Sequence, residues 1–294
     1  MPSIDSLLTA FEEQRYVADR DLATVLYLAL TLERPLLPEG EAGVGKTEVG
    51  ATLARVLNTE LIRLQCYEGI DAATALYEWD YPRQMLAIRL LESRGEAKSV
   101  TTRDIFTEEF LIRRPLLRAI TDSDSAPPVL LIDEIDRADE EFEAFLLELL
   151  SDFTVTIPEI GTLRATRAPR VILTSNRTRE VHDALKRRCL YHWIDYPTAE
   201  RERAILQARL PDVPTELAEE VVSFVQRLRT ASLTKIPGIA ETLDWAAALV
   251  SLGTVRLTPD VVEQTLGALL KYREDVAAMR NGGARGVLRE LKAS

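Results

Sequence analysis

The stretch that decides the fold is GEAGVGKT, residues 40–47, which lies between the apolar run PLLPE (35–39) and the helical pattern EVGATLARVL (48–57). It matches G-x-x-x-x-G-K-[ST] in the strand, loop and helix context that this phosphate-binding motif needs. Its glycines let the backbone turn its N–H groups inward around phosphate oxygens, and the helix that follows adds its positive dipole end. We therefore expect nucleotide phosphates to be bound by the residues of this loop: Gly40, Glu41, Ala42, Gly43, Val44, Gly45, Lys46, Thr47 and Glu48.

Two side chains at the end of this loop have separate predicted roles. Lys46 is expected to reach the β- and γ-phosphates, where its ammonium takes part in catalysis, and Thr47 to bind Mg²⁺ through its hydroxyl. The motif thus predicts ATP and Mg²⁺ as the bound groups. The alternative, an ordinary glycine-rich turn, does not explain the strand before it and the helix after it.

The overall composition limits the classes of protein to which the chain can belong. Its 294 residues are 46% apolar, enough for one large domain or two smaller ones. The net charge of -11 argues against non-specific affinity for nucleic acid. Cys66 and Cys189 lack C-x-x-C spacing, so we expect two small core residues in a reducing compartment. Because no targeting segment and no long uncharged run is present, we expect a cytoplasmic protein without a membrane span.

The pattern of apolar and polar residues changes at Pro197. Before it, helical patterns alternate with short apolar runs of strand length: LIRLQC (61–66), VLLID (129–133), VILTSN (171–176) and YHWID (191–195). Continuous apolar strands indicate burial on both faces, hence a largely parallel sheet between layers of helices. After Pro197 only helical patterns follow, and Thr258 with Pro259 has the form of a helix start. We expect an α/β nucleotide-binding domain over residues 1–197 and an all-helical domain over 198–294.

The second chemical signal is VLLIDEID (129–136), an apolar strand that runs directly into two acids. A carboxylate at the C-terminal end of a parallel strand faces the crevice where such sheets bind ligands. Asp133 is therefore expected to hold Mg²⁺ through its waters, and Glu134 to polarise the attacking water. An acidic loop after a core strand is the alternative. Asp136 and the glutamates beyond it are expected on an exposed helix face without chemistry.

The third signal is VILTSNRT (171–178), where another apolar strand ends in polar side chains. If this strand lies beside the strand of the phosphate-binding loop, Asn176 is expected between the γ-phosphate and Glu134, where it orients the water. A strand that simply ends in polar residues is the alternative. The order of the three signals along the chain favours the functional interpretation.

Four segments together resemble the AAA+ ATPases: GEAGVGKT, LLIDEIDRA, LTSN and LKRRC (185–189), followed by a helical domain. Within that superfamily, LYEWDYPRQML (76–86) and IAETLDWAAAL (239–249) resemble the MoxR group and its CoxD-like members, which accompany carbon monoxide dehydrogenase genes. The resemblance extends from about residue 15 to the end. It implies a P-loop αβα sandwich with a mostly parallel five-stranded sheet, inserted β-hairpins and a small all-helical lid domain.

The resemblance also implies roles for particular residues. Asn176 would be the first sensor, and Arg188 would be the arginine finger that acts on a neighbouring subunit, with Arg187 as the alternative. One hairpin is expected within FTVTIPEIGTLRATR (153–167), and a second insertion within residues 76–105. Relatives carry an arginine in the lid helix where this chain has Glu241, so the residue that couples the lid to the nucleotide stays unassigned.

The implied activity is Mg²⁺-dependent hydrolysis of ATP by a ring of six subunits that remodels a protein client. The resemblance suggests maturation of a molybdenum-containing carbon monoxide dehydrogenase, together with a partner that bears a von Willebrand factor A domain. Charge supports assembly: residues 161–190 contain eight cations against two acids, and 131–152 contain nine acids against Arg137 alone. Opposite charges on one chain suit a head-to-tail contact that closes into a ring.

Two other classes of function stay open. A P-loop nucleic-acid motor or restriction-type translocase would share the core, although the basic segment lacks the interleaved aromatic residues of a nucleic-acid site. A nucleotide-gated scaffold would bind ATP without needing its turnover. A small-molecule kinase would leave the helical domain and the LKRRC segment without a role.

Overall fold

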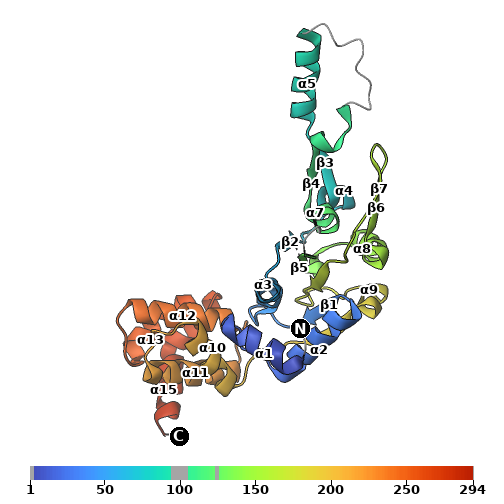
Figure 1. The fold of residues 1–294 in the computed structure, drawn as a ribbon. Helices are drawn as coiled ribbons and strands as arrows, with labels where there is room; N and C mark the ends of the chain where they lie inside the picture. Colours follow the sequence, from blue (N-terminus) through green and yellow to red (C-terminus); the bar gives the residue numbers. More distant parts are fainter. Residues whose placement is uncertain (1–2, 94–104, 123–125, 294) are drawn as a thin grey trace. The chain divides into compact units, whose positions relative to one another are not determined.

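A computed structural model describes residues 3–93, 105–122 and 126–293 of the chain (Figure 1). The chain divides into two compact units. One comprises residues 24–39 and 50–192 and contains the main sheet, and the other comprises residues 1–23, 40–49 and 193–294 and is mainly helical. The predicted domain boundary at residue 197 stays a prediction.

The main sheet has five strands in the order β2-β5-β8-β1-β9. Its strands are β1 (Leu36–Glu39), β2 (Leu61–Gln65), β5 (Val129–Asp133), β8 (Arg170–Leu173) and β9 (Leu190–Trp193). The pairs β2 with β5, β5 with β8, and β8 with β1 are all parallel. The predicted fold class is confirmed, because non-consecutive parallel strands need the crossover helices that the sequence places between them.

Burial differs between the central and the outer strands. Every residue of β1 and β5 is buried, and so are the last three of β8. In β2 buried and exposed residues alternate, and β9 is largely half-buried. The prediction that LIRLQC and YHWID are buried on both faces is wrong, because these segments form the two edges of the sheet and only one face of each is covered.

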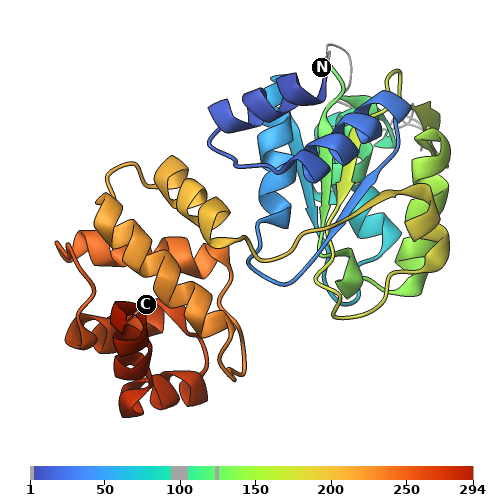
Figure 2. The ribbon, with the colours of Figure 1, turned by 90° about the horizontal axis from the view of Figure 1, so that it is seen from below.

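Helices lie on both faces of the sheet (Figure 2). They are α2 (Arg20–Leu32), α3 (Lys46–Leu57), α7 (Pro115–Thr121), α8 (Glu140–Asp152) and α9 (Asp183–Arg188). Gly50 of α3 lies directly over Leu131, and a Cβ at Gly50 would come within 3.1 Å of the leucine side chain. The helix that follows the phosphate-binding loop therefore packs closely on the central strand β5.

Two inserts extend away from the main sheet (Figure 1). The hairpin of β6 (Thr154–Ile157) and β7 (Gly161–Arg164) confirms the predicted hairpin. The other insert consists of α4 (Ala72–Leu76), β3 (Tyr77–Trp79), α5 (Tyr81–Ser93) and β4 (Leu111–Arg113). It begins at Ala72, before the predicted stretch 76–105, and it closes beyond residue 105, since β3 pairs with β4 in antiparallel register. Part of the predicted segment, residues 94–104, lies outside the described residues.

The helical unit contains α1 (Ile4–Glu13), α10 (Ala199–Arg209), α11 (Thr215–Arg229), α12 (Ile239–Ser251), α13 (Pro259–Leu269), α14 (Arg273–Ala278) and α15 (Ala284–Ala293). Thr258 caps α13 with Pro259 in its first turn, as predicted. The chain leaves the helical conformation after α13, because Leu270 turns to an extended conformation while it stays buried. The break lets Asp275 accept hydrogen bonds from the backbone of Thr234 and Lys235.

Candidate nucleotide site

The phosphate-binding loop begins directly after β1 and ends where α3 begins at Lys46. Gly43 and Gly45 have φ angles of 82° and 94°, which side chains with a Cβ rarely adopt. The Lys46 ammonium donates to the carbonyl oxygens of Gly40 at 2.8 Å and Glu41 at 2.6 Å, and so lies within the curve of the loop. A glycine-shaped loop with an ammonium inside it, at a helix N-terminus, fits the phosphates of a nucleotide.

The N-terminus of lid helix α12 lies on this loop, and both belong to the helical unit. The Ala240 N–H donates to the Gly43 carbonyl at 3.1 Å. A Cβ at Gly238 would come within 2.8 Å of the same carbonyl. The loop and the lid helix therefore meet through their backbones.

Glu241 has a structural role at this contact. Its Oε2 accepts the Gly238 N–H at 2.9 Å, which caps α12. The same oxygen would lie 2.8 Å from a Cβ at Gly43. The chain thus places beside the phosphate-binding loop a carboxylate that is bound to its own helix start. The ammonium of Lys235 has no assigned role.

A buried arginine of the lid is also bound within the helical unit. The Arg229 guanidinium pairs with the fully buried Glu202 at 2.7 Å and stacks on the Tyr196 ring, 5.1 Å from the ring centroid. Burial, followed by the charge of Glu41, raises the pKa of Tyr196. Because the Arg229 guanidinium neutralises the buried Glu202 carboxylate, its positive charge is paired within the helical unit.

Asp133 and Glu134 lie at the end of β5 in the sheet unit. Asp133 is 2% exposed; its Oδ1 accepts from the Thr174 hydroxyl at 2.5 Å, and its Oδ2 pairs with the Arg63 guanidinium at 2.5 Å. Glu134 has a left-handed backbone, with φ 56° and ψ 51°, and its carboxylate pairs with Arg137 at 2.8 Å. A left-handed residue other than glycine is often found where a site needs a side chain in a set direction.

Arg63 is the site residue that sequence reasoning missed. It lies on edge strand β2, and its guanidinium is half exposed at 51%. It bridges Asp133 and the Gln65 side chain, to which it donates at 2.7 Å. The signal was the alternation of polar and apolar residues in LIRLQC, which we interpreted as a continuous apolar run. A half-exposed cation on a buried carboxylate fits a site where Mg²⁺ takes its place, because Mg²⁺ prefers carboxylate oxygens.

Asn176 follows β8 and is half-buried. Its backbone N–H donates to Asp136 Oδ1 at 3.1 Å. The prediction that Asp136 and the following glutamates are exposed is wrong for Asp136 and Glu143, which are 3% and 1% exposed. Both are buried because segment 176–182, some forty residues further along the chain, supplies their hydrogen-bond partners.

Arg187 and Arg188 form the C-terminal end of α9, and both are exposed. Their backbone carbonyls accept hydrogen bonds from the Arg34 guanidinium at 2.7 and 3.1 Å. Arg34 thereby binds the negative end of the helix dipole and fixes the helix end. Both side chains are exposed to solvent at the end of the helix.

The two oppositely charged segments partly neutralise each other within one chain. Arg179 of the basic segment pairs with Glu143 of the acidic segment. Arg170 is also paired, at 3.1 Å, with Glu33, which lies outside both segments. The acids that stay exposed are Asp139, Glu140, Glu141, Glu148 and Asp152, and the exposed cations are Arg164, Arg167, Arg177, Arg187 and Arg188. The charge available to a neighbouring subunit is therefore smaller than the sequence count indicates.

Other chemistries find little support. Burial raises the pKa of the Cys66 thiol to about 12 and that of Cys189 to about 12, so neither is a nucleophile near neutral pH. Among the described residues, no group of three or more His, Cys, Asp and Glu side chains converges as a metal site would require. Within the same ranges, no helix has the length and apolarity to cross a membrane.

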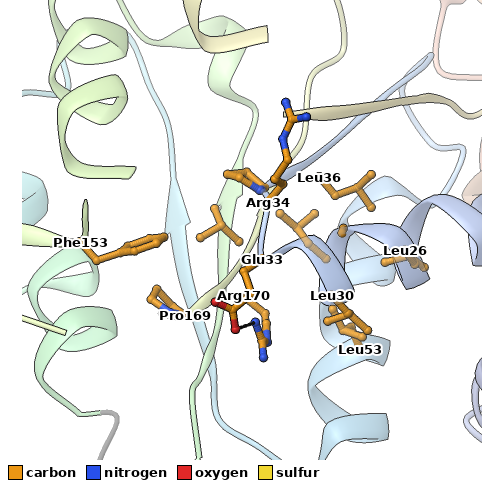
Figure 3. A pocket seen from close by; sticks show the side chains of 13 residues that line it. Leu26, Leu30, Glu33, Arg34, Leu36, Leu53, Phe153, Pro169 and Arg170 are labelled. Atoms are coloured by element: carbon orange, nitrogen blue, oxygen red, sulfur yellow. Dashed lines mark hydrogen bonds and ion pairs between the residues drawn. The ribbon is translucent and has the colours of Figure 1, made fainter. Parts of the chain in front are cut away.

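A mainly apolar pocket lies at the amino-terminal ends of β1 and β8, the opposite ends from those that lead to the site (Figure 3). Leu26, Leu36, Leu53 and Phe153 are among its lining residues, and the Glu33–Arg170 ion pair lies at its side. The lining residues include none of the predicted site residues.

The chain is similar to several known proteins. The chain is 25% identical over 262 residues to an uncharacterized protein of Staphylococcus epidermidis, covering 85% of this chain and 89% of that protein. An uncharacterized protein of Staphylococcus aureus is 23% identical over 208 residues, with 68% and 70% covered.

A solved structure, the RuvB Holliday junction branch migration motor of Thermotoga maritima, is 18% identical with a TM-score of 0.46, covering 84% of this chain and 67% of that one. Residues 35–189, more than half of the chain, match the family model of the AAA domain, dynein-related subfamily. This match begins just before β1 and ends just after α9, so it contains the phosphate-binding loop, both strand ends and the LKRRC segment. The chain therefore belongs to the AAA-domain proteins of the dynein-related subfamily.

Proposed function

We propose that this protein is a MoxR-type AAA+ ATPase of the CoxD-like group that hydrolyses ATP with Mg²⁺ and uses the turnover to remodel a protein client. The observation that carries the proposal is the glycine loop with Lys46 inside it, in a chain whose strand β5 ends in Asp133 and the left-handed Glu134. A protein that only binds a nucleotide needs the phosphate-binding loop alone. A protein that hydrolyses the nucleotide also needs acidic residues such as Asp133 and Glu134 after β5.

The residues act as follows in this proposal. The loop residues 40–48 bind the phosphates, with Lys46 on the β- and γ-phosphates. Thr47 and Asp133 would be the residues that hold Mg²⁺, and the ion would supply positive charge to offset that on the phosphate oxygens. Glu134 polarises the attacking water, and Asn176 orients it. Glu134 is half-buried and paired with Arg137, so Arg137 has to release it for this task.

Assembly is part of the proposal. The subunits form a ring, which the family resemblance puts at six, and Arg188 or its neighbour Arg187 reaches the γ-phosphate bound by the next subunit. Both side chains are exposed at the end of α9, as this role requires. We propose the domain boundary at residue 197, with residues 198–294 as the lid.

The client belongs to the proposal as well. The CoxD-like resemblance indicates maturation of a metalloenzyme such as a molybdenum-containing dehydrogenase, with a von Willebrand factor A domain protein as partner. The two cysteines are buried and unpaired, which suits the reducing cytoplasm.

The test combines turnover with capture. ATP hydrolysis should depend on Mg²⁺, should be lost in Lys46→Ala together with nucleotide binding, and should be lost in Glu134→Gln while binding is kept. Glu219→Gln is the matched control, because Glu219 is an exposed acid of α11 to which the proposal gives no role. Affinity-tagged Glu134→Gln with ATP should retain the client. Normal hydrolysis by Glu134→Gln would refute the proposal, and turnover that DNA or RNA stimulates would favour the nucleic-acid motor.

A further inference from the structure

Two buried carboxylates that follow β5 hold the segment between Asn176 and α9. Asp136 lies in the short turn Ile135–Arg137, and Glu143 lies in α8. Burial of a carboxylate is costly unless its oxygens are paired. The partners of both acids come from one stretch, residues 176–182, which leads from the proposed sensor to the helix that carries the proposed finger.

Asp136 binds both sides of a strained residue. Its Oδ1 accepts the Asn176 N–H at 3.1 Å, and its Oδ2 accepts the Thr178 N–H at 2.9 Å and the Thr178 hydroxyl at 2.7 Å. Arg177, between them, has a left-handed φ of 55°. Such a conformation persists in a residue other than glycine only when its surroundings hold it. The carboxylate supplies that restraint by bridging the N–H groups on both sides.

Glu143 acts in the same way at the other end of the segment. Its Oε2 accepts the His182 N–H at 2.6 Å, and its Oε1 pairs with the Arg179 guanidinium. His182 is the N-cap of α9, and its Nδ1 accepts the Ala184 N–H at 3.2 Å. Glu143 therefore fixes the point from which α9 begins, six residues before Arg188.

Thr174 joins the segment of Asn176 to the residues between Asp133 and Asp136. The Glu134 N–H donates to the Thr174 hydroxyl at 2.9 Å, and the Ile135 N–H donates to the Thr174 carbonyl at 2.9 Å. The stretches 133–136 and 174–178 thus form one hydrogen-bonded unit. A shift of Asp136 would move Asn176 relative to Glu134.

We infer that Asp136 and Glu143 are positioning residues for the hydrolysis proposed above, on which this inference rests. Asp136 holds Asn176 in register with Glu134, and Glu143 sets the start of α9 and with it the place of Arg187 and Arg188. Each acts through another residue. The segment 176–182, which both acids hold, leads from Asn176, which orients the water, to the helix that carries Arg187 and Arg188.

The test for Asp136 is Asp136→Asn, which keeps the size of the side chain but turns an NH₂ group toward backbone donors. Hydrogen exchange should accelerate in the peptide that contains Asn176 and Thr178. The turnover number should fall roughly 10- to 100-fold, as displacement of a catalytic group by about 1 Å does. The dissociation constant of a fluorescent ATP analogue should stay within about twofold, because the phosphate-binding loop is untouched.

Glu143→Gln should give a different exchange pattern. The peptide that contains His182 and the start of α9 should lose protection, while the peptide that contains Asn176 keeps it. Turnover should fall by a similar factor. Glu219→Gln is again the control: it removes one exposed acid of α11 and should change neither exchange nor turnover.

Three results would overturn the inference. Unchanged exchange in Asp136→Asn would show that the carboxylate does not hold the segment. Faster exchange with normal turnover would show that Asn176 does not need to be held. A loss of turnover matched by an equal loss of nucleotide affinity and melting temperature would show a general role in folding. If the parent protein hydrolyses no ATP, the proposed function itself fails, and exchange still decides whether the acids hold the segment.

Discussion

Gly238→Ala should uncouple the lid helix from the phosphate-binding loop. A Cβ at Gly238 would lie 2.8 Å from the carbonyl carbon and oxygen of Gly43 and 3.0 Å from the carbonyl oxygen of Ala42. These are backbone atoms of a loop whose shape is already restrained, so no flexible side chain can move aside to accept the methyl group. The φ angle of Gly238 is -84°, so alanine meets no backbone strain of its own, and the effect comes from the contact alone.

The size of the effect follows from this contact. Overpacking of this kind costs about 1–3 kcal/mol. Loss of the Ala240–Gly43 hydrogen bond, which is 3.1 Å long, would add roughly 0.5–1.5 kcal/mol. Because the strain falls on Gly43, which shapes the phosphate-binding loop, we expect nucleotide affinity to fall about 10-fold, the equivalent of about 1.4 kcal/mol.

The assay is titration with a fluorescent ATP analogue, together with thermal melting. Gly267→Ala is the matched control, because Gly267 lies within α13 with open space around its Cβ position. That substitution should leave nucleotide affinity unchanged and should stabilise the helix by about 0.5–1 kcal/mol. The two alanines should therefore shift the melting temperature in opposite directions.

A second variant separates the contact from helix capping. Gly238 is the N-cap of α12, and alanine is a poor N-cap, whereas serine is a good one. If lost capping caused the effect, Gly238→Ser would restore affinity. If the Cβ causes it, serine should weaken binding at least as much as alanine. Nucleotide affinity that is unchanged in both variants would refute the proposed contact between loop and lid.

Three further predictions concern single side chains. Arg63→Met should lower the melting temperature in Mg²⁺-free buffer, because it leaves the buried Asp133 without its cation, and Mg²⁺ with nucleotide should restore most of the loss. Arg89→Met, at an exposed site on α5, is the control. Equal melting temperatures with and without Mg²⁺ in both variants would contradict the pairing of Arg63 with Asp133. Arg34→Ala should destabilise the protein by about 1–3 kcal/mol in urea unfolding, because the last carbonyls of α9 lose their donor; an unchanged midpoint would argue against this. Cys66 and Cys189, with thiol pKa values near 12, should react with a thiol reagent at pH 8 only after unfolding, since the thiolate fraction in the native protein is about one in ten thousand. Their raised pKa should also make the free energy of unfolding fall as pH rises from about 9 toward 12, because only the unfolded thiols ionise in that range. Rapid labelling of the native protein would contradict both expectations.

The parts of the fold that the sequence predicts well are those set by local patterns. The loop at 40–47 needs glycines at set positions, the central strands β5 and β8 need continuous apolar residues, and the hairpin of β6 and β7 needs a turn between alternating strands. Each pattern spans about ten residues or fewer. Parallel pairing of these strands then follows, because the helical patterns between them supply the crossover connections that such pairing requires.

The parts that the sequence does not predict depend on distant partners. In the run of acids after Asp133, nothing local distinguishes the buried Asp136 and Glu143 from the exposed Glu140. The difference arises because segment 176–182 folds back over two of them and supplies N–H donors. The role of Arg63 has the same origin, since strand order decides that β2 lies beside β5 and so brings a guanidinium to Asp133. The charge of a residue is visible in the sequence, but its partner is not.

Glu241 shows why a role cannot always be transferred with a position. Gly238 has no side chain with which to cap α12, so the helix start depends on a carboxylate three residues later, which accepts the Gly238 N–H. An arginine at position 241 has no acceptor and could not replace this cap. Gly238 itself has to lack a Cβ because Gly43 lies against it. The close approach of the loop to α12, the missing side chain at 238 and the glutamate at 241 therefore depend on one another, and the Ala240–Gly43 hydrogen bond joins the loop directly to the start of α12.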